Sequence, residues 1–283
     1  SVMEFKSQVD VRIAEKMARF PLLGERIDGT WNVSFTAEFH MTNHSYLFKT
    51  APDKDRLPLY EGKMIWHFDH QFAENKWWIN ETEGRAVLKP RENERYDYEY
   101  YRIGFRDVAA STNERTLIAT VIPPHVFAGN TLPTLIEPTE PKTMVAIVAL
   151  FDSLIADWFM RQRVTNHCNF FYMKQLPVPR LTEKDAAFRP IVERAARLIC
   201  TTPEFDDLAQ EIFGGQANAA SVGATVPAER AKLRAELDGL VAHRYGLTEE
   251  EFAYILTTFP LVPDAAKIAA HNAFRNVEKG LVK

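Results

Sequence analysis

Two segments of the sequence combine residue types that could do chemistry. His67 and His70 stand three residues apart, and Asp53, Glu61 and Lys63 imitate the acid, acid, lysine pattern of magnesium-dependent nucleases. In such a nuclease the carboxylates hold Mg²⁺ and the lysine orients the attacking water. Asp53, however, lies in a charged loop (APDKDR), and neither a Cys nor a further His stands at ligand spacing from the histidine pair. We therefore predict no catalytic residue and no metal ligand in this chain, and keep the nuclease as an alternative.

Other catalytic signatures are missing from the sequence. It contains no GxGxxG, GxxxxGK[ST], HExxH or GxSxG motif, so a cofactor-binding domain is unsupported. Cys168 and Cys200 are too few for a disulfide framework or a four-ligand zinc site, which favours a reducing, cytoplasmic location. The first ten residues carry Glu4, Lys6 and Asp10, which argues against a signal peptide. No run of about 18 apolar residues predicts a membrane span.

The charge is slightly negative overall but unevenly distributed. The net charge of −4 excludes a uniformly basic nucleic-acid binder. Between Asp157 and Glu183 there is no acidic residue, and this window holds several basic residues: Arg161, Arg163, His167, Lys174 and Arg180. Such a window is either an electrostatic footprint for a polyanion or a set of solvated helix ends. Aromatic residues between Tyr60 and Phe105 interleave with arginines, which supplies either stacking surfaces and phosphate partners or a packed core.

The elements that must position these residues change in character along the chain. Up to about residue 135, short runs rich in aromatic and β-branched residues predict strands; they cover Thr30–Thr36, Met64–Phe68, Tyr96–Tyr100 and Thr116–Ile122, the last as a buried central strand, and Asn169–Leu176 follows later. Helical periodicity predicts helices over residues 5–17, Met144–Met160, Asp185–Ile199, Pro227–Tyr245, Glu250–Thr257 and Asp264–Val277. Gly214–Thr225 is predicted to be a flexible linker. The fold class is α+β: a mixed or antiparallel β-rich domain with a core helix, followed by an α-helical C-terminal tail.

Leu57–Phe72 (LPLYEGKMIWHFDHQF) closely resembles a block in the C-terminal half of large adenine-specific DNA methyltransferases of restriction-modification systems, which carry a TaqI-like specificity domain. Further ordered blocks resemble the same family: Glu38–Asn43, Tyr101–Ala109, Ser111–Pro124, Leu150–Leu154, Asn169–Phe171, Lys174–Pro179 and tail segments between 233 and 260. The closing block is also similar to the target-recognition domains of type I specificity subunits. The resemblance covers nearly the whole chain.

The resemblance implies a division into three parts. Residues 1–21 would be an N-terminal helix and linker from a missing catalytic domain, 22–180 a DNA target-recognition domain, and 181–283 a helical C-terminal region with the flexible loop 214–225. These methyltransferases bind S-adenosylmethionine with a glycine-rich loop and hold the flipped adenine with an [ND]PP[YF] motif. Neither motif is present, since the only proline pair stands in Ile122-Pro-Pro-His125. We therefore expect the recognition part of such an enzyme without its catalytic half; a start at Ser1 agrees with a cut chain or with removal of an initiator Met.

The resemblance also implies the partners and the contact residues. Double-stranded DNA and the catalytic domain of the same parent chain are the expected partners, in a bacterial defence system and away from membranes, and S-adenosylmethionine is expected only in the missing domain. Arginine and lysine read guanine, and asparagine and glutamine read adenine. The residues expected to contact DNA are Lys63, His67 and His70 from the first block, Arg106, Asn113 and Arg115 from the central block, and Arg161, Arg163, Asn166, His167 and Lys174 from the basic window.

Purely structural roles are the alternative for several of these residues. Arg106 with Asp107, and Glu114 with Arg115, are alternatively internal ion pairs, and Asn113 is alternatively a turn cap. The acidic helical tail favours docking on another domain or subunit, so a protein-interaction module is the competing class of function.

Overall fold

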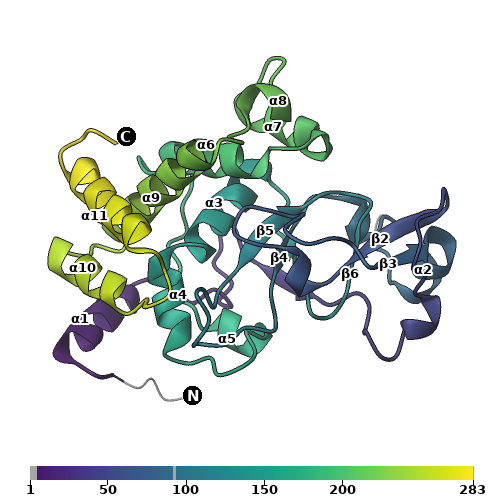
Figure 1. Ribbon diagram of the computed structural model, residues 1–283, viewed down its shortest axis with the longest axis horizontal. Helices are drawn as coiled ribbons and strands as arrows, with labels where there is room; N and C mark the ends of the chain where they lie inside the picture. The colour runs from purple at the N-terminus through teal and green to yellow at the C-terminus, as the bar shows by residue number, and fades with distance from the viewer. Residues whose placement is uncertain (1–4, 92–93, 283) are drawn as a thin grey trace.

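The first half of the chain builds two small β-sheets, and the second half is helical (Figure 1). The computed structural model describes residues 5–91 and 94–282. One sheet is antiparallel, in the order β1 (Ser34–Thr36), β7 (Thr134–Glu137), β4 (Arg102–Phe105) and β5 (Ala119–Ile122). In the other, β2 (Arg56–Tyr60) lies between β3 (Trp77–Asn80), to which it is antiparallel, and β6 (Phe127–Ala128), to which it is parallel. The α+β class predicted from the sequence is confirmed.

The helices follow the capping signals of the sequence. A capping box of Ser7 and Asp10 opens α1, Pro227 stands at the start of α9, and Thr248 with Glu251 opens α10. The helices are α1 (Gln8–Met17), α2 (Glu81–Val87), α3 (Pro141–Phe151), α4 (Leu154–Arg161), α5 (Phe170–Lys174), α6 (Phe188–Ile199), α7 (Asp206–Phe213), α8 (Ala219–Val222), α9 (Pro227–Arg244), α10 (Glu249–Thr257) and α11 (Asp264–Glu278). Short 3₁₀ turns lie at Ser45–Leu47, Gly62–Met64, Asp97–Glu99 and Pro203–Phe205.

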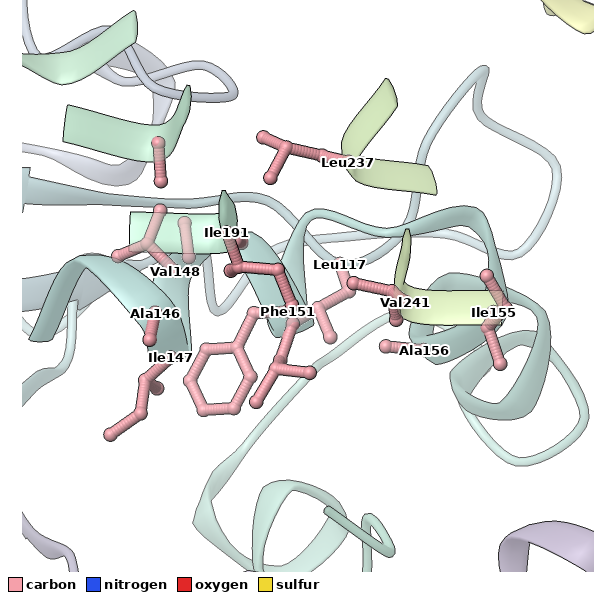
Figure 2. Close-up of a cluster of buried hydrophobic side chains, with 14 of the residues drawn as sticks. Leu117, Ala146, Ile147, Val148, Phe151, Ile155, Ala156, Ile191, Leu237 and Val241 are labelled. Atoms are coloured by element: carbon pink, nitrogen blue, oxygen red, sulfur yellow. The ribbon is translucent and has the colours of Figure 1, made fainter. Parts of the chain in front are cut away.

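Helix α3 lies at the centre of the main core. It is apolar on every side, which is why all its residues from Met144 to Phe151 are buried. It packs against β4 and β5 on one side and against α6 and α7 on the other. Figure 2 shows Phe151 among side chains from α3, α4, α6 and α9. The cluster includes Ile13, Phe105 and Val241, so all three parts expected from the sequence contribute to one core.

The apolar run predicted as one helix, Met144–Met160, is two helices. Asp152 and Ser153 separate α3 from α4, and the two axes are bent by 56°. The side chain of Ser153 accepts a hydrogen bond from Ala156 N and starts a new helix. Among the described residues no single helix is long and apolar enough to cross a membrane, and only this bent pair, taken together, has the length and composition.

Several predicted strands are wrong. Residues 64–68 are a 3₁₀ end and a tight turn in which Phe68 has a φ of 59°, a left-handed conformation that no strand allows. Residues 96–100 hold the 3₁₀ turn Asp97–Glu99, and Asn169–Leu176 holds α5, which Asn169 caps. Of Thr30–Thr36 only the last three residues form a strand. The run ending at Ile122 forms β5, which was predicted to be a central strand but lies at the edge of its sheet. Its residues are nevertheless buried, because α3 packs against them.

The loop predicted to be flexible is partly ordered. Within Gly214–Thr225, Asn218 caps the short helix α8, and Ala219 and Ala224 are buried. A Cβ at Gly223 would lie 2.3 Å from the carbonyl oxygen of Cys200, so glycine is required by close packing there.

A buried ion pair joins the two sheets. Arg102 of β4 lies 3.0 Å from Glu38, and its Nη2 also donates to Val126 O at 2.7 Å. Glu38 in turn accepts from Ala128 N of β6 at 2.7 Å. Burial raises the pKa of Glu38, and Arg102 opposes that shift.

Candidate functional site

Three loops that are distant in sequence meet beside β4. Arg106 Nη2 donates to Lys63 O at 3.4 Å, which joins the first loop to the second. Ala109 N donates to Asn166 O at 3.1 Å, and Val108 bridges to His167, which joins the second loop to the third. We call the exposed residues of these loops the loop surface: Lys63, Phe72, Val108, Asn113, Asn166 and His167.

An aromatic stack forms one end of the loop surface. The rings of Trp66 and Phe72 are stacked with centroids 5.2 Å apart, and the Arg106 guanidinium lies 4.9 Å from the Trp66 centroid. Arg106 Nε donates to Ile65 O at 3.0 Å, which fixes the position of the guanidinium. Partial burial lowers the pKa of Arg106. Phe72 remains 55% exposed. The stack therefore presents the Phe72 ring to solvent, with Trp66 packed against its other face.

Polar groups form the rest of the loop surface. His167 Nδ1 lies 2.8 Å from the carboxylate of Asp107, and its side chain is 59% exposed. Lys63 is exposed and lies 3.0 Å from Glu61, so its charge is partly offset. Asn113 and Asn166 are exposed. Five of the residues predicted to contact DNA thus lie on these three loops: Lys63, Arg106, Asn113, Asn166 and His167.

Other predicted contact residues lie inside the protein. His67 is 2% exposed, His70 3% and Arg115 8%. His70 bonds Thr202 Oγ1 at 3.1 Å and Tyr60 OH at 3.3 Å, and burial lowers its pKa. The sequence could not reveal this, because residue type alone does not show that His67 and His70, on either side of the Phe68 turn, point inward while Lys63 of the same block is exposed.

His67 and Arg115 belong to a buried polar cluster. His67 Nε2 bonds Leu117 O at 3.0 Å, and Arg115 Nε donates to Asp157 at 2.6 Å. Burial, reinforced by nearby arginines, lowers the pKa of His67 well below its usual range, so the imidazole is neutral. In this conformation neither side chain offers a donor to a ligand at the loop surface.

The basic window is divided between structural and exposed cations. The Arg161 side chain is 9% exposed, pairs with Asp157 at 3.2 Å, and donates to the carbonyl oxygens of Asn113 and Glu114. Arg163 donates to Gln175. Lys174 is exposed on α5 with its Nζ 5.9 Å from the Phe35 ring. The predicted DNA contacts of these residues stay predictions, but Arg161 already has its partners within the chain.

The carboxylates of the alternative nuclease pattern do not converge. Asp53 is exposed and precedes β2, whereas Glu61 follows it. Five residues of strand separate them, and at about 3.3 Å per residue this is too far for one shared Mg²⁺. Within the described part of the chain, no group of three or more His, Cys, Asp or Glu side chains is arranged to hold a metal ion.

The buried cluster also contains residues that were not predicted from the sequence: Asp152, Asp157, Asp238 and their neighbour Arg234. The signal was present: two aspartates interrupt the otherwise apolar run MVAIVALFDSLIADWFM. A charged residue inside a core helix requires a buried partner. The two aspartates therefore predict that arginines from other segments are buried beside them.

The fold and the loop surface define an α+β protein with a loop-built polar face. No family model and no curated protein matches the chain. Among solved structures it resembles the Type IIL restriction-modification enzyme MmeI, determined in complex with DNA, with a TM-score of 0.47 and 13% identity over 89% of this chain. The chain spans 38% of that protein's length.

Proposed function

We propose that this chain recognises double-stranded DNA as the specificity part of an adenine-specific DNA methyltransferase of a restriction-modification system. The observation that carries the proposal is the contact of three separate loops, which carry the exposed residues Lys63, Asn113, Asn166 and His167. Sequence-reading proteins combine cations for phosphates with amide side chains for base edges in this manner. The Leu57–Phe72 block, in which the family resemblance is strongest, forms one of the three loops.

The chemistry of each group assigns it a role in this proposal. Lys63 contacts a phosphate, and Asn113 and Asn166 present amides that pair with adenine edges in the major groove. Phe72 and Val108, both more than half exposed, give apolar contacts to thymine methyl groups or to an unstacked base. His167 is held by Asp107, which fixes the direction of its second ring nitrogen.

Methyl transfer requires a second domain. The cofactor loop and the adenine-gripping motif are missing from the sequence, so in this proposal S-adenosylmethionine binds to a catalytic domain that pairs with this chain. The chain's own residues orient the DNA and supply the specificity, within the bacterial cytoplasm.

Selection from a pool of random duplexes tests the proposal. The 283-residue chain should enrich a defined sequence, and the double variant Lys63→Ala, His167→Ala should bind that duplex at least about tenfold more weakly. Lys232→Ala is the matched control, because Lys232 is 75% exposed on α9 and pairs with a glutamate, as Lys63 does. Failure to enrich any sequence, or equal loss in the control, would overturn the proposal and leave the protein-interaction module as the better hypothesis.

A further inference from the structure

A tight turn, Trp66–Asp69, connects the exposed aromatic stack with the interior of the protein. Trp66 N donates to Asp69 O at 2.8 Å and Asp69 N donates to Trp66 O at 3.0 Å, so His67 and Phe68 form the tip of the turn. Trp66 stacks on the exposed ring of Phe72, whereas His67 and Phe68 are only 2% and 4% exposed. The position of the stack therefore depends on the contacts that hold the tip.

The backbone at the tip is strained. Phe68 has a φ of 59°, a left-handed conformation that costs free energy in a residue other than glycine. Such a conformation persists only where the surrounding structure holds it in place. The Phe68 side chain is buried in the main core, which supplies part of this support. Further contacts come from the C-terminal helical region, residues 181–283.

Two arginines of α9 contact the tip. Arg230 and Arg234 are four residues apart, so their side chains leave the same face of the helix. Arg234 Nη2 lies 3.4 Å from His67 Nδ1, and Arg230 Nη2 donates to Phe68 O at 3.5 Å. Arg230 Nη1 also donates to Leu198 O at 2.8 Å, which fixes its guanidinium against α6. The tip is thus joined to α9 at both of its residues.

The segment between α6 and α7 holds the residues that follow the turn. His70 Nε2 bonds Thr202 Oγ1 at 3.1 Å, and Gln71 Nε2 donates to Glu204 Oε1 at 3.5 Å. Residues 67–71 are therefore held by two separate parts of the helical region. The next residue in the chain carries the exposed ring of the aromatic stack.

We propose that Arg234 and Thr202 are positioning residues that hold the aromatic end of the loop surface in place. Through them the helical region determines where the exposed ring of Phe72 lies relative to the other two loops. The positioning is a property of the chain alone, whereas its effect on DNA recognition rests on the proposed function. In this proposal the helical region contributes to sequence discrimination through contacts within the chain.

Hydrogen exchange of the full chain, followed by mass spectrometry of its peptides, tests the positioning without DNA. Arg234→Met keeps the apolar stem, and Thr202→Val keeps the side-chain shape and changes no charge. Each should raise the exchange rate over residues 65–72 at least about fivefold, and Arg234→Lys should restore part of the protection. Arg244→Met is the matched control, because Arg244 is also a partly buried arginine of α9 but pairs with Asp185 at 3.2 Å. It should change exchange over residues 65–72 less than about twofold.

The duplex enriched by the selection experiment tests the consequence for recognition. In Thr202→Val and Arg234→Met the affinity for this duplex should fall at least about tenfold, because the aromatic contact is displaced. Affinity for a random duplex should change less than about twofold, since the exposed cations that contact phosphates are unaffected. Arg244→Met should leave both affinities nearly unchanged.

Unchanged exchange over residues 65–72 in both Arg234→Met and Thr202→Val would overturn the proposal. So would an equal rise in the peptides of α3, because this would show general destabilisation instead of a local release. Raised exchange over residues 65–72 with unchanged affinity for the selected duplex would overturn the role in recognition. If the unmodified chain enriches no duplex, the proposed function fails, and the exchange experiment alone decides whether the helical region positions the turn.

Discussion

Arg115 Nε donates to the carboxylate of Asp157 at 2.6 Å, and this bond ties the loop before β5 to the middle of α4. The Asp157 side chain is fully buried, and it also accepts from Arg161 and from Thr116 N. Every oxygen of this carboxylate is therefore satisfied within the chain. The arrangement explains why two arginines of the predicted DNA-contact set serve the fold.

Asp157→Ala should strongly destabilise the protein. Removing the carboxylate leaves Arg115 and Arg161 buried without their shared partner, and breaking a buried ion pair in this way costs about 3–5 kcal/mol. Urea denaturation measures the change. Glu193→Ala removes one partner of the exposed Arg189 pair, also at 2.6 Å, and should cost less than about 1 kcal/mol. Similar losses in the two variants would contradict the buried role of Asp157.

The stability of the protein should fall in mild acid partly because of His67. Its pKa in the folded state is well below 6.5, so below pH 6.5 the unfolded chain binds a proton that the folded protein does not. The contribution is present above pH 6.5 and is lost as the pH falls toward the folded-state pKa. His67→Gln should reduce the slope of unfolding free energy against pH below 6.5 by up to about 1.4 kcal/mol per unit.

Asp238 should contribute a pH dependence of stability with the sign opposite to that of His67, which provides an internal check. Its pKa is raised from 3.8 to about 6, so its contribution is present at low pH and is lost as the pH rises through that interval. Asp238→Asn should therefore change the slope in the direction opposite to that of His67→Gln. Identical changes in the two variants would show that the pH dependence arises elsewhere.

Local signals in the sequence located most of the helices. Helical periodicity located α1, α6, α9, α10 and α11 to within a few residues, and Pro227 and the capping box at Thr248 marked the starts of α9 and α10. The strands were harder, since alternation over 64–68 and 96–100 arises from residues that pack around turns. The break between α3 and α4 was missed because apolar residues continue on both sides of it, although Ser153 caps α4 locally.

The candidate site was predictable only in part. Residue types selected Lys63, Asn113, Asn166 and His167, and these are exposed on loops that contact one another. The same reasoning selected His67, which is buried, because residue type does not determine the side to which a loop turns its side chains. Phe72 was not selected, since an aromatic residue is expected in the core and its 55% exposure is visible only in the structure.

Gly239→Ala should loosen the contact between α9 and α11, which lie side by side (Figure 1). A Cβ at Gly239 would lie 2.9 Å from backbone atoms of Ala273 and Phe274, closer than packing allows. Overpacking of this kind costs about 1–3 kcal/mol, against a gain in helix propensity of about 1 kcal/mol. Thermal unfolding should show a lower Tm, whereas Asn272→Ala on the exposed face of α11 should leave it nearly unchanged. An unchanged Tm in Gly239→Ala would mean that the helices separate at little cost.

Lys63 and Phe72 should contribute to DNA binding in different ways. Lys63→Ala removes one phosphate contact, so the slope of log affinity against log salt should become shallower by about 0.9. Phe72→Ala removes an apolar contact, so affinity should fall by up to about 1–3 kcal/mol while the slope stays the same. Tyr46→Ala is the control for an exposed aromatic ring outside the loop surface, since Tyr46 is 69% exposed. Fluorescence anisotropy with the selected duplex over a salt series separates the two effects. Equal effects of Phe72→Ala and Tyr46→Ala, or an unchanged slope in Lys63→Ala, would remove these residues from the DNA-binding face.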